Sequence, residues 1–237
     1  ETDALVDRAA AVRAGIGWQG KNANVLIPGR GSWFVLGSVI TDAPLSVGVP
    51  MSDGCGACQR CLEGCPTGAI VAPGVGDARR CLAWLVQAPG HIPIEFREAM
   101  GGRLYGCDDC QEVCPVGRTE RDTEDSDAPG ADHDAREVLS ASDDELLEQF
   151  GSWYIADRDP RYLRRNALVA MANTAIPDNP RVLELVERYL ADSDPLLRSH
   201  AVWAASRLGR SDMLDRLSGD LDPGVRAELE RAGTLGV

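Results

Sequence analysis

The stretch CGACQRCLEGCP, residues 55–66, places Cys55, Cys58, Cys61 and Cys65 at x2, x2 and x3 spacing and ends on Pro66. Bacterial ferredoxins use this spacing to bind [4Fe–4S] clusters. Three closely spaced thiolates can reach three corners of one cubane, while the fourth is carried away where the chain reverses at the proline. That fourth thiolate serves a second cubane. The run therefore predicts a site for two clusters.

A second run, CDDCQEVCP at residues 107–115, and the preceding Cys81 supply the other cysteines. We assign one cluster to Cys55, Cys58, Cys61 and Cys114, and the other to Cys65, Cys81, Cys107 and Cys110. Zinc is the alternative, because paired CxxC motifs also form tetrahedral sites. Zinc leaves the third close cysteine and both Cys-Pro steps unexplained, so we expect clusters that pass single electrons.

The composition narrows the class of protein. The chain has 237 residues, enough for one large or two modest domains. All eight cysteines lie between Cys55 and Cys114, unlike the framework of a secreted disulfide protein, so we expect a reducing cytoplasm. No apolar run approaches the roughly 18 residues of a membrane-spanning helix. The net charge of −13 resides mostly beyond Arg118, with 14 basic and 25 acidic residues there, so a nucleic-acid partner is not excluded.

The residues before the cysteines suggest a helix and then strands. ALVDRAAAVRAG at 4–15 has helical spacing and ends on Gly15, while NANVLIP at 22–28 and SWFVLGSVIT at 32–41 predict a β-hairpin around Pro28–Gly31. GIGWQG at 15–20 matches the dinucleotide fingerprint G-x-G-x-x-G. That fingerprint needs a strand before it and a helix after it, whereas here the order is reversed, so nucleotide binding is not predicted.

The second half of the sequence is helical. An acidic segment rich in turn residues covers 119–135, and then Asp-Pro phrases recur at Asp159, Asp194 and Asp222, where Asp is a good N-cap and Pro a good first helical residue. Their spacing resembles HEAT-like repeats, with an irregular helical bundle as the alternative. We divide the chain into an N-terminal domain with the expected hairpin at 1–50, a two-cluster domain at 51–118, a linker at 119–135 and a helical repeat domain at 136–237.

A family resemblance rests on AGIGWQGKN at 14–22, GSWFVLGSVITDAPL at 31–45, CPTGAI at 65–70, DARRC at 77–81 and RLYGCDDCQEVCP at 103–115. In this order the motifs closely resemble the epoxyqueuosine reductases, cobalamin- and iron–sulfur-dependent enzymes of tRNA queuosine maturation. The resemblance implies an α+β fold in which a partial cobalamin-binding domain with a β-hairpin precedes a ferredoxin-like module and an all-α HEAT-like tail. That family's domain begins well before this point, so we expect a fragment.

The resemblance also implies roles for residues. Glu1 aligns with the family's catalytic Asp, a proton donor, and cobalamin contacts are implied at Lys21, Asn22, Asn24, Val25 and Leu36. For Lys21, Asn22 and Asn24, which lie at a polar turn before the first strand, an exposed turn without a ligand is the alternative. Ala4, Gly102 and Val116–Gly117 depart from the family pattern. Trp18 and Trp33 could cover a cofactor, although core packing is the commoner role of tryptophan. Arg79, Arg80 and Arg103 are candidates for tRNA phosphates, with a solvated surface as the alternative. The three histidines receive no role.

The expected function is reduction of epoxyqueuosine in tRNA to queuosine by a cytoplasmic, monomeric enzyme that is fed by an external electron donor. Three alternatives come from other classes: a ferredoxin-type electron carrier, a corrinoid reductive dehalogenase, and an interaction scaffold in which the repeats do the work. The hairpin and the glycine-rich motif before the cysteines speak against the simple carrier. The repeat tail speaks against the dehalogenase.

Overall fold

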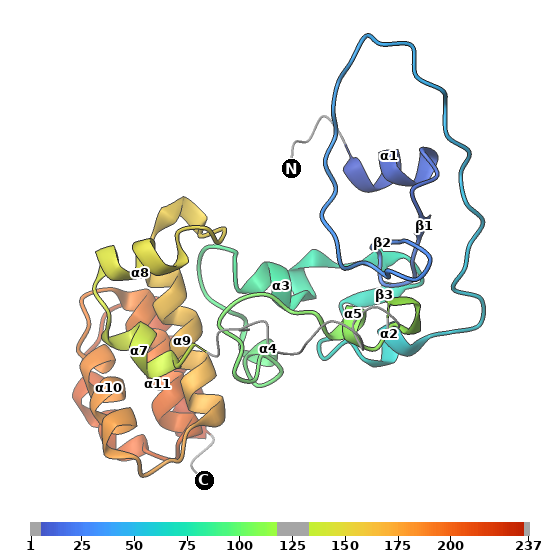
Figure 1. Cartoon of the computed structure of the whole chain (residues 1–237). Helices are drawn as coiled ribbons and strands as arrows, with labels where there is room; N and C mark the ends of the chain where they lie inside the picture. Colours follow the sequence, from blue (N-terminus) through green and yellow to red (C-terminus); the bar gives the residue numbers. More distant parts are fainter. Residues whose placement is uncertain (1–5, 118–132, 235–237) are drawn as a thin grey trace. The chain divides into compact units, whose positions relative to one another are not determined.

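The computed structural model describes residues 6–117 and 133–234 (Figure 1), and internal contacts divide them into two compact parts. The cysteine part comprises the chain through Cys81 together with the segment that begins at Asp108. The helical part comprises Leu82–Cys107 and the chain from Ala131 onward. Residues 82–107, which the sequence analysis assigned to the two-cluster domain, pack with the helices in the structure, and the expected domain division stays a prediction.

The first helix of the cysteine part, α1, spans Asp7–Arg13 and ends just before Gly15, as the sequence predicted. Gly15 has φ +73°, in the left-handed region that favours glycine. A Cβ there would lie 2.1 Å from the carbonyl oxygen of Val49, so the close approach of the two backbones also requires glycine. The helix is followed by a strand, which agrees with the exclusion of a dinucleotide fold.

A short antiparallel sheet follows α1. Strand β1, Trp18–Gln19, pairs with β2, Val25–Leu26, in the register Trp18↔Leu26. The expected hairpin around Pro28–Gly31 is therefore only partly right. Its turn forms, because the N–H of Ile27 donates to the carbonyl of Gly31 at 2.9 Å, but the partner of β2 is the preceding strand rather than the following run.

The run after the turn is held elsewhere. Ser32 Oγ donates to Gln111 Oε1 at 2.8 Å, and Gly31 packs so closely on Gly117 that a Cβ on Gly31 would lie 2.9 Å from the Gly117 Cα. These two contacts direct the chain toward the second cysteine run and away from β2. They explain why the second half of the expected hairpin does not form.

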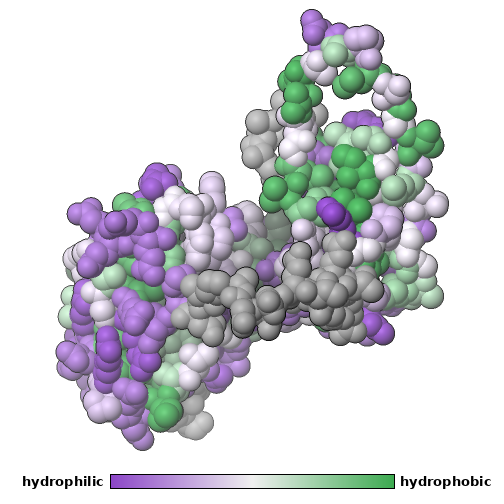
Figure 2. All heavy atoms as spheres, viewed as in Figure 1, coloured by the Kyte–Doolittle hydropathy of each residue, from purple (hydrophilic) through white to green (hydrophobic). Residues whose placement is uncertain are grey.

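The chain from residue 33 to residue 51 then makes a wide open loop without strand pairing among the described residues (Figure 1). Its side chains are largely apolar yet exposed, with Val35 and Ile40 at 96 % and Val39 at 91 %. Figure 2 shows hydrophobic side chains along this loop. An apolar strand-like run of this kind is normally covered on its faces or paired at its edges.

The rest of the cysteine part is built from short elements. Helix α2, which carries Cys61, packs against α5, which carries Cys110, and this contact brings the two cysteine runs together. The remaining pieces are a two-stranded antiparallel sheet and two 3-10 turns. The elements are α2 (Arg60–Glu63), β3 (Ile70–Ala72), β4 (Val75–Gly76), η1 (Ala78–Arg80), α5 (Asp109–Glu112) and η2 (Pro115–Gly117).

The helical part stacks its longer helices side by side. Helix α9 packs on α7 and α11, and α11 packs in turn on α10 and α12. Ala167, Ala201 and Ala204 are fully buried, and their small side chains let the helices approach closely. Its elements are α3 (Leu82–Leu85), α4 (Ile94–Arg97), α7 (Ala135–Ser140), α8 (Asp143–Phe150), η3 (Ala156–Arg158), α9 (Arg161–Thr174), α10 (Pro180–Leu190), α11 (Pro195–Arg207), η4 (Ser211–Met213), η5 (Asp215–Leu217) and α12 (Pro223–Thr234).

The three Asp-Pro phrases lie at the starts of helices. Helices α11 and α12 begin at the proline as expected, whereas α9 begins one residue later, at Arg161. Asp159 accepts the backbone N–H of Arg161 at 3.0 Å, Asp194 that of Leu196 at 2.8 Å, and Asp222 that of Gly224 at 2.8 Å. Each carboxylate thereby satisfies an N–H group that the first helical turn leaves without a partner. The mostly helical fold with small sheets agrees with the expected class. No helix of the described residues is both long and apolar enough to cross a membrane.

Side chains of the helical domain fasten the segment 82–107. Arg165 of α9 is fully buried and donates to the carbonyls of Ala88 at 2.7 Å and Leu85 at 3.2 Å. Its neighbour Asn166 donates to the carbonyl of Leu104 at 2.9 Å. Burial lowers the pKa of Arg165 to about 10, and these carbonyls accept hydrogen bonds from the buried guanidinium. The segment is therefore an integral layer of the helical part.

Candidate iron–sulfur site

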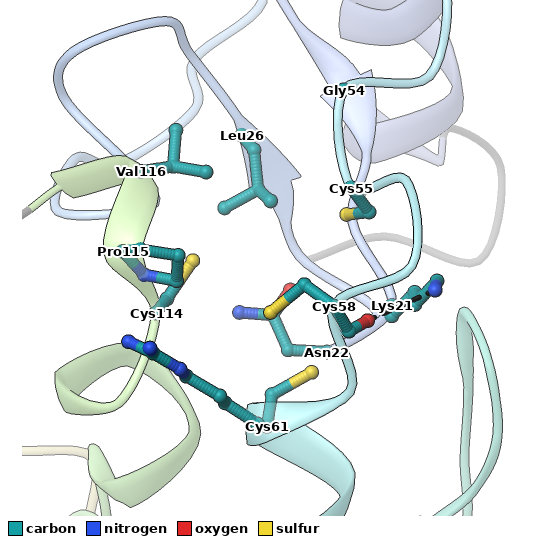
Figure 3. Close-up of a pocket in the computed structure, with 11 residues that line it drawn as sticks. Lys21, Asn22, Leu26, Gly54, Cys55, Cys58, Cys61, Cys114, Pro115 and Val116 are labelled. Atoms are coloured by element: carbon teal, nitrogen blue, oxygen red, sulfur yellow. Dashed lines mark hydrogen bonds between the residues drawn. The ribbon is translucent and has the colours of Figure 1, made fainter.

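Four thiols line one cavity in the cysteine part. The sulfur atoms of Cys55, Cys58, Cys61 and Cys114 surround a space of about 50 Å³ (Figure 3). Three of the four cysteines come from the loop before α2 and from α2 itself, and the fourth follows α5. These are the four residues that the sequence assigned to one cluster. The other lining residues are Lys21, Asn22, Leu26, Gly54, Arg60, Pro115 and Val116.

The first cysteine loop is tightly wound by its own backbone and by one cation. The N–H of Cys58 donates to the carbonyl of Cys55 at 3.1 Å, and Gly56 between them takes a φ of +50°. Lys21 Nζ donates to the carbonyls of Gly56 at 2.6 Å and Cys58 at 2.9 Å. Asp53 Oδ1 accepts the N–H of Cys55 at 2.8 Å. The loop is thus held in shape by contacts of the chain itself.

An indole covers one of the thiols. Trp18 is 7 % exposed, and its Nε1–H donates to Cys55 Sγ at 3.4 Å. Trp18 therefore packs in the core and also hydrogen-bonds to a candidate ligand. A Cβ on Gly54 would lie 2.7 Å from the Trp18 ring, so a glycine is needed for the loop to pass over the indole. Trp33, the other tryptophan considered from the sequence, is 39 % exposed.

Burial makes two thiols of this cavity, Cys61 and Cys114, hard to ionise without compensation. Burial raises the pKa of Cys61 and of Cys114, and the neighbouring thiols raise both further through their mutual repulsion. Metal ligation requires deprotonated thiolates, so a cationic centre within the cavity is the natural compensation. The donor set and its surroundings fit an iron–sulfur cluster. Among the described residues, no three His, Cys, Asp or Glu side chains converge as in a single-ion site.

The second expected set is Cys65, Cys81, Cys107 and Cys110. Cys65 Sγ accepts the N–H of Ala69 at 3.2 Å and lies 3.8 Å from Thr67 Oγ1. Burial acts to raise the pKa of Cys65, but hydrogen bonds from backbone N–H groups outweigh it, so the pKa is lowered. Cys107 is the last residue of the segment that belongs to the helical part. The common ligation of these four residues therefore stays a prediction. None of the eight cysteines is in a disulfide.

The residues expected to contact cobalamin have other surroundings. Lys21 and Asn22 line the cysteine cavity, while the N–H of Asn24 donates to Asn22 Oδ1 at 3.2 Å. Val25 is buried in β2, and Leu36 is half-buried in the open loop. The role of these five residues in cobalamin binding stays a prediction. Glu1 lies outside the described residues.

The arginines considered for phosphate contacts are engaged within the protein. Arg79 forms an ion pair with Asp77 at 2.9 Å, although its side chain is 84 % exposed. Arg80 donates to the carbonyl of Thr67 at 3.0 Å. Arg103 donates to the carbonyl of Met100 at 3.1 Å and belongs to the helical part. The role of these residues in tRNA binding stays a prediction.

Sequence reasoning missed two residues that lie against the cysteines. Asp53 and the hydroxyl of Thr67 contact cysteine atoms, yet no spacing rule points to them. Trp18, which was expected either to cover a cofactor or to pack in the core, donates its Nε1–H to Cys55 Sγ. The motif GWQGKN, which was noticed for other reasons, contains two residues of the cavity wall, Lys21 and Asn22. A search for polar residues within this motif could have placed both near the cysteines.

Comparison with known proteins agrees with this architecture. Residues 54–117 match a family of 4Fe-4S double cluster binding domains, and residues 148–232 match HEAT repeats. The epoxyqueuosine reductase of Bacillus subtilis is 38 % identical over 236 residues, which cover 98 % of this chain and 58 % of that protein. The epoxyqueuosine reductase of Vibrio cholerae is 40 % identical over 209 residues, which cover 84 % of this chain and 55 % of that protein.

Solved structures of epoxyqueuosine reductases are also similar to this chain. The structure of epoxyqueuosine reductase from Bacillus subtilis aligns with a TM-score of 0.84 at 35 % identity, covering 99 % of this chain and 64 % of that one. A crystal structure of epoxyqueuosine reductase with an epoxyqueuosine-modified tRNA-Tyr stem loop aligns with a TM-score of 0.84 at 34 % identity. The chain spans 58 % of the Bacillus subtilis protein's length. The chain is therefore homologous, over nearly its whole length, to the epoxyqueuosine reductases, and it carries a 4Fe-4S double cluster binding domain.

Proposed function

We propose that this chain is the electron-delivering portion of an epoxyqueuosine reductase and that it acts on tRNA. The grouping of Cys55, Cys58, Cys61 and Cys114 around one cavity carries the proposal, because it joins the first cysteine run to the last cysteine of the second run. That exchange is the arrangement of a two-cluster ferredoxin module. The homology to epoxyqueuosine reductases, and the solved relative with a modified tRNA stem loop, supply the substrate class.

The proposed reaction balances with two electrons and two protons. Both C–O bonds of the epoxide break, a C=C double bond forms between the two carbons, and the oxygen leaves as water. Bound [4Fe–4S] clusters would supply the chemistry of accepting and releasing one electron at a time. The electrons enter from an external low-potential one-electron donor. A pair of one-electron centres suits a reaction that consumes two electrons.

The chain's own residues position and shelter the proposed cluster. Lys21 fixes the carbonyls of the Cys55–Cys58 loop, so that the thiols keep their directions before and after electron transfer. Trp18 donates to Cys55 Sγ and covers one side of that half-buried thiol. Leu26, Pro115 and Val116 give the cavity an apolar wall. A dry and rigid surrounding reduces the rearrangement that accompanies each electron transfer and sets the potential.

Cluster content tests the first half of the proposal. The protein purified without oxygen should carry about eight iron and eight sulfide per chain, since two cubanes hold four of each. The variant Cys58→Ser should disturb one cluster and Cys65→Ser the other, so their Mössbauer or EPR spectra should differ. A colourless, zinc-loaded protein would contradict the assignment.

Turnover tests the second half. With the upstream segment restored, the protein would be supplied with cobalamin and a low-potential reductant and incubated with tRNA that carries epoxyqueuosine. The nucleosides would then be analysed by mass spectrometry. Loss of one oxygen from the nucleoside is the expected result. A ferredoxin-type carrier is not favoured, because the homology extends through the repeats. Reduced clusters that neither bind the tRNA nor change it would support that carrier instead.

Cobalamin and Glu1 enter the proposal through the family resemblance. Corrinoid absorbance that stays with the protein after gel filtration would support the cofactor. Proton donation by a positioned acid contributes about a hundredfold to ten-thousandfold in rate. Glu1→Gln should therefore lose most turnover while keeping the clusters, and Glu1→Asp should retain it. Unchanged single-turnover rates in Glu1→Gln would leave the proton source to another group.

A further inference from the structure

The cysteine cavity contains a polar group that no residue satisfies. Asn22 is 6 % exposed, and its Nδ2 is buried without any hydrogen-bond partner in the described structure. Figure 3 shows the Asn22 side chain among Cys58, Cys61 and Cys114. A buried amide N–H₂ left without an acceptor costs roughly 1–3 kcal/mol. Such a group in a folded protein calls for an acceptor that occupies the cavity.

The orientation of the amide follows from its other end. Asn22 Oδ1 accepts the backbone N–H of Asn24 at 3.2 Å, and only the oxygen of an amide can accept that bond. The nitrogen must therefore be the end that faces the cavity. A Cβ on Gly20 would lie 2.7 Å from Asn22 Oδ1, so the glycine leaves the room that this orientation requires. The direction of the N–H₂ group is built into the turn.

Neither a cysteine thiol nor a backbone carbonyl of the described residues accepts a hydrogen bond from Asn22 Nδ2. No sulfur of the four cysteines accepts a bond from Nδ2, although all four line the same cavity. The other side chains of the lining are either apolar, as Leu26, Pro115 and Val116 are, or cationic, as Lys21 and Arg60 are, and neither kind can accept a hydrogen bond. Inorganic sulfide is a hydrogen-bond acceptor with partial negative charge, and it stands at the free corners of a cubane held by four thiolates.

We propose that Asn22 donates an Nδ2–H hydrogen bond to a sulfide of the cluster held by Cys55, Cys58, Cys61 and Cys114, and thereby raises the reduction potential of that cluster. The inference rests on the proposed cluster. Reduction adds an electron whose charge spreads onto the sulfides, so an N–H donor stabilises the reduced state more than the oxidised state. Asn22 is a positioning and tuning residue that makes no bond to iron.

The test is a redox titration of Asn22→Leu, which keeps the shape of the side chain and removes the donor. The electron affinity of one cluster should fall about tenfold, which is a shift of about 59 mV to more negative potential for a one-electron couple. Thr67→Val is the matched control, since Thr67 lies beside Cys65 of the other set and should leave this cluster's potential unchanged. Iron and sulfide content is measured in every variant.

A second measurement needs no variant. In wild-type protein labelled with ¹⁵N at asparagine side chains, pulsed EPR of the reduced cluster should show a hyperfine coupling to one labelled nitrogen. Unshifted potentials in a fully loaded Asn22→Leu protein, or no such coupling in the wild type, would overturn the inference while leaving the clusters intact. A protein without iron would instead overturn the cluster assignment. If Asn22→Leu loses its iron, the coupling alone decides.

Discussion

At the scale of single residues, His200 is buried although nothing in the sequence pattern predicts it, and this burial changes its pKa. Its ring lies wholly inside the helical part, where Nδ1 donates to the carbonyl of Leu196 at 2.8 Å and Nε2 accepts the N–H of Ile92 at 3.3 Å. Burial lowers the pKa of His200 well below 6.5, and the positive charge of Arg97 lowers it further. Its neighbour His91, stacked at 5.5 Å, has a lowered pKa as well.

The helical part should therefore lose stability in mild acid. Below about pH 6.5, His200 binds a proton in the unfolded chain but stays neutral in the folded chain. The free energy of unfolding therefore falls as the pH drops. The slope should approach about 1.4 kcal/mol per pH unit for this site. Denaturant titrations followed by circular dichroism from pH 7 to pH 5 measure it. We expect His200→Gln to be less stable at pH 7 and to show a smaller slope.

A matched variant separates titration from packing. Ser199 is buried beside His200, and its hydroxyl donates to the carbonyl of Leu196 at 2.9 Å. Ser199→Ala should lower stability at every pH and keep the wild-type slope, because serine does not titrate in this range. If His200→Gln shows the same dependence of unfolding free energy on pH as the wild type, a group other than His200 causes that dependence.

Individual residues also mark the limit of sequence-based prediction. The eight cysteines could be assigned, because their spacing is itself the requirement of the chemistry. Arg165 could not be placed, since arginine in a helix is normally at the surface. Only the folded structure shows that it faces the carbonyls of Leu85 and Ala88. Asn22 was noted as part of a polar turn, but its direction toward the thiols depends on the bond to Asn24.

At the scale of elements, the helix caps should contribute measurably. Asp194 accepts the N–H of Leu196 at 2.8 Å and so satisfies a group at the start of α11. Replacement by alanine should lower the free energy of unfolding by about 1 kcal/mol. Asp194→Asn should retain most of that stability, because asparagine caps as well as aspartate does. Equal losses in both variants, measured by thermal or urea unfolding, would attribute the effect to charge rather than to capping.

The elements before the cysteines were harder to predict than those after them. The Asp-Pro signals act within one helical turn, so they could be interpreted from a few residues. The strand run 32–41 has the right composition for a hairpin, yet β-structure depends on a partner far away in sequence. Here the partner of β2 is β1, and Ser32 is bound to Gln111. Local pattern alone could not decide between these pairings.

The exposed apolar side chains of the open loop at 33–51 should make the isolated chain prone to self-association. Val39 is 91 % exposed and Val47 92 %, within a run of other exposed apolar side chains. The double variant Val39→Lys, Val47→Lys should bind less of a hydrophobic dye and scatter less light, with an unchanged circular dichroism spectrum. Leu221→Lys is the control, since Leu221 is 88 % exposed but belongs to the helical part and not to this run. Equal effects of both variants would contradict the prediction.

At the scale of the whole molecule, residues that are neighbours in sequence do not all belong to the same compact part. The segment 82–107 lies between cysteines in sequence but belongs to the helical part, where Leu82, Ile92 and Met100 are at most 1 % exposed. The cysteine spacing predicted the two ends of the cluster module. It gave no information on where the intervening residues pack, because the long gap between Cys81 and Cys107 carries no ligand.

A chain that ends at residue 132 should therefore fail to fold, even though it keeps all eight cysteines. Exposure of several large apolar side chains costs about 2 kcal/mol each. The sum rivals the 5–15 kcal/mol stability of a typical domain. We expect the shortened chain to be insoluble, whereas a chain of residues 82–237 should be soluble and helical by circular dichroism. A soluble 1–132 chain with full iron content would show that segment 82–107 can pack without the repeats.

Lys21 is the only lysine of the chain, against 23 arginines, and it is clamped on the carbonyls of Gly56 and Cys58. An amine-specific acylating reagent therefore has a single side-chain target in the whole molecule. While the cysteine loop is intact, the clamp should slow acylation, and release of the loop should speed it. Mass spectrometry of one peptide would then follow the assembly and damage of the metal-binding loop in a crude mixture, without any colour measurement.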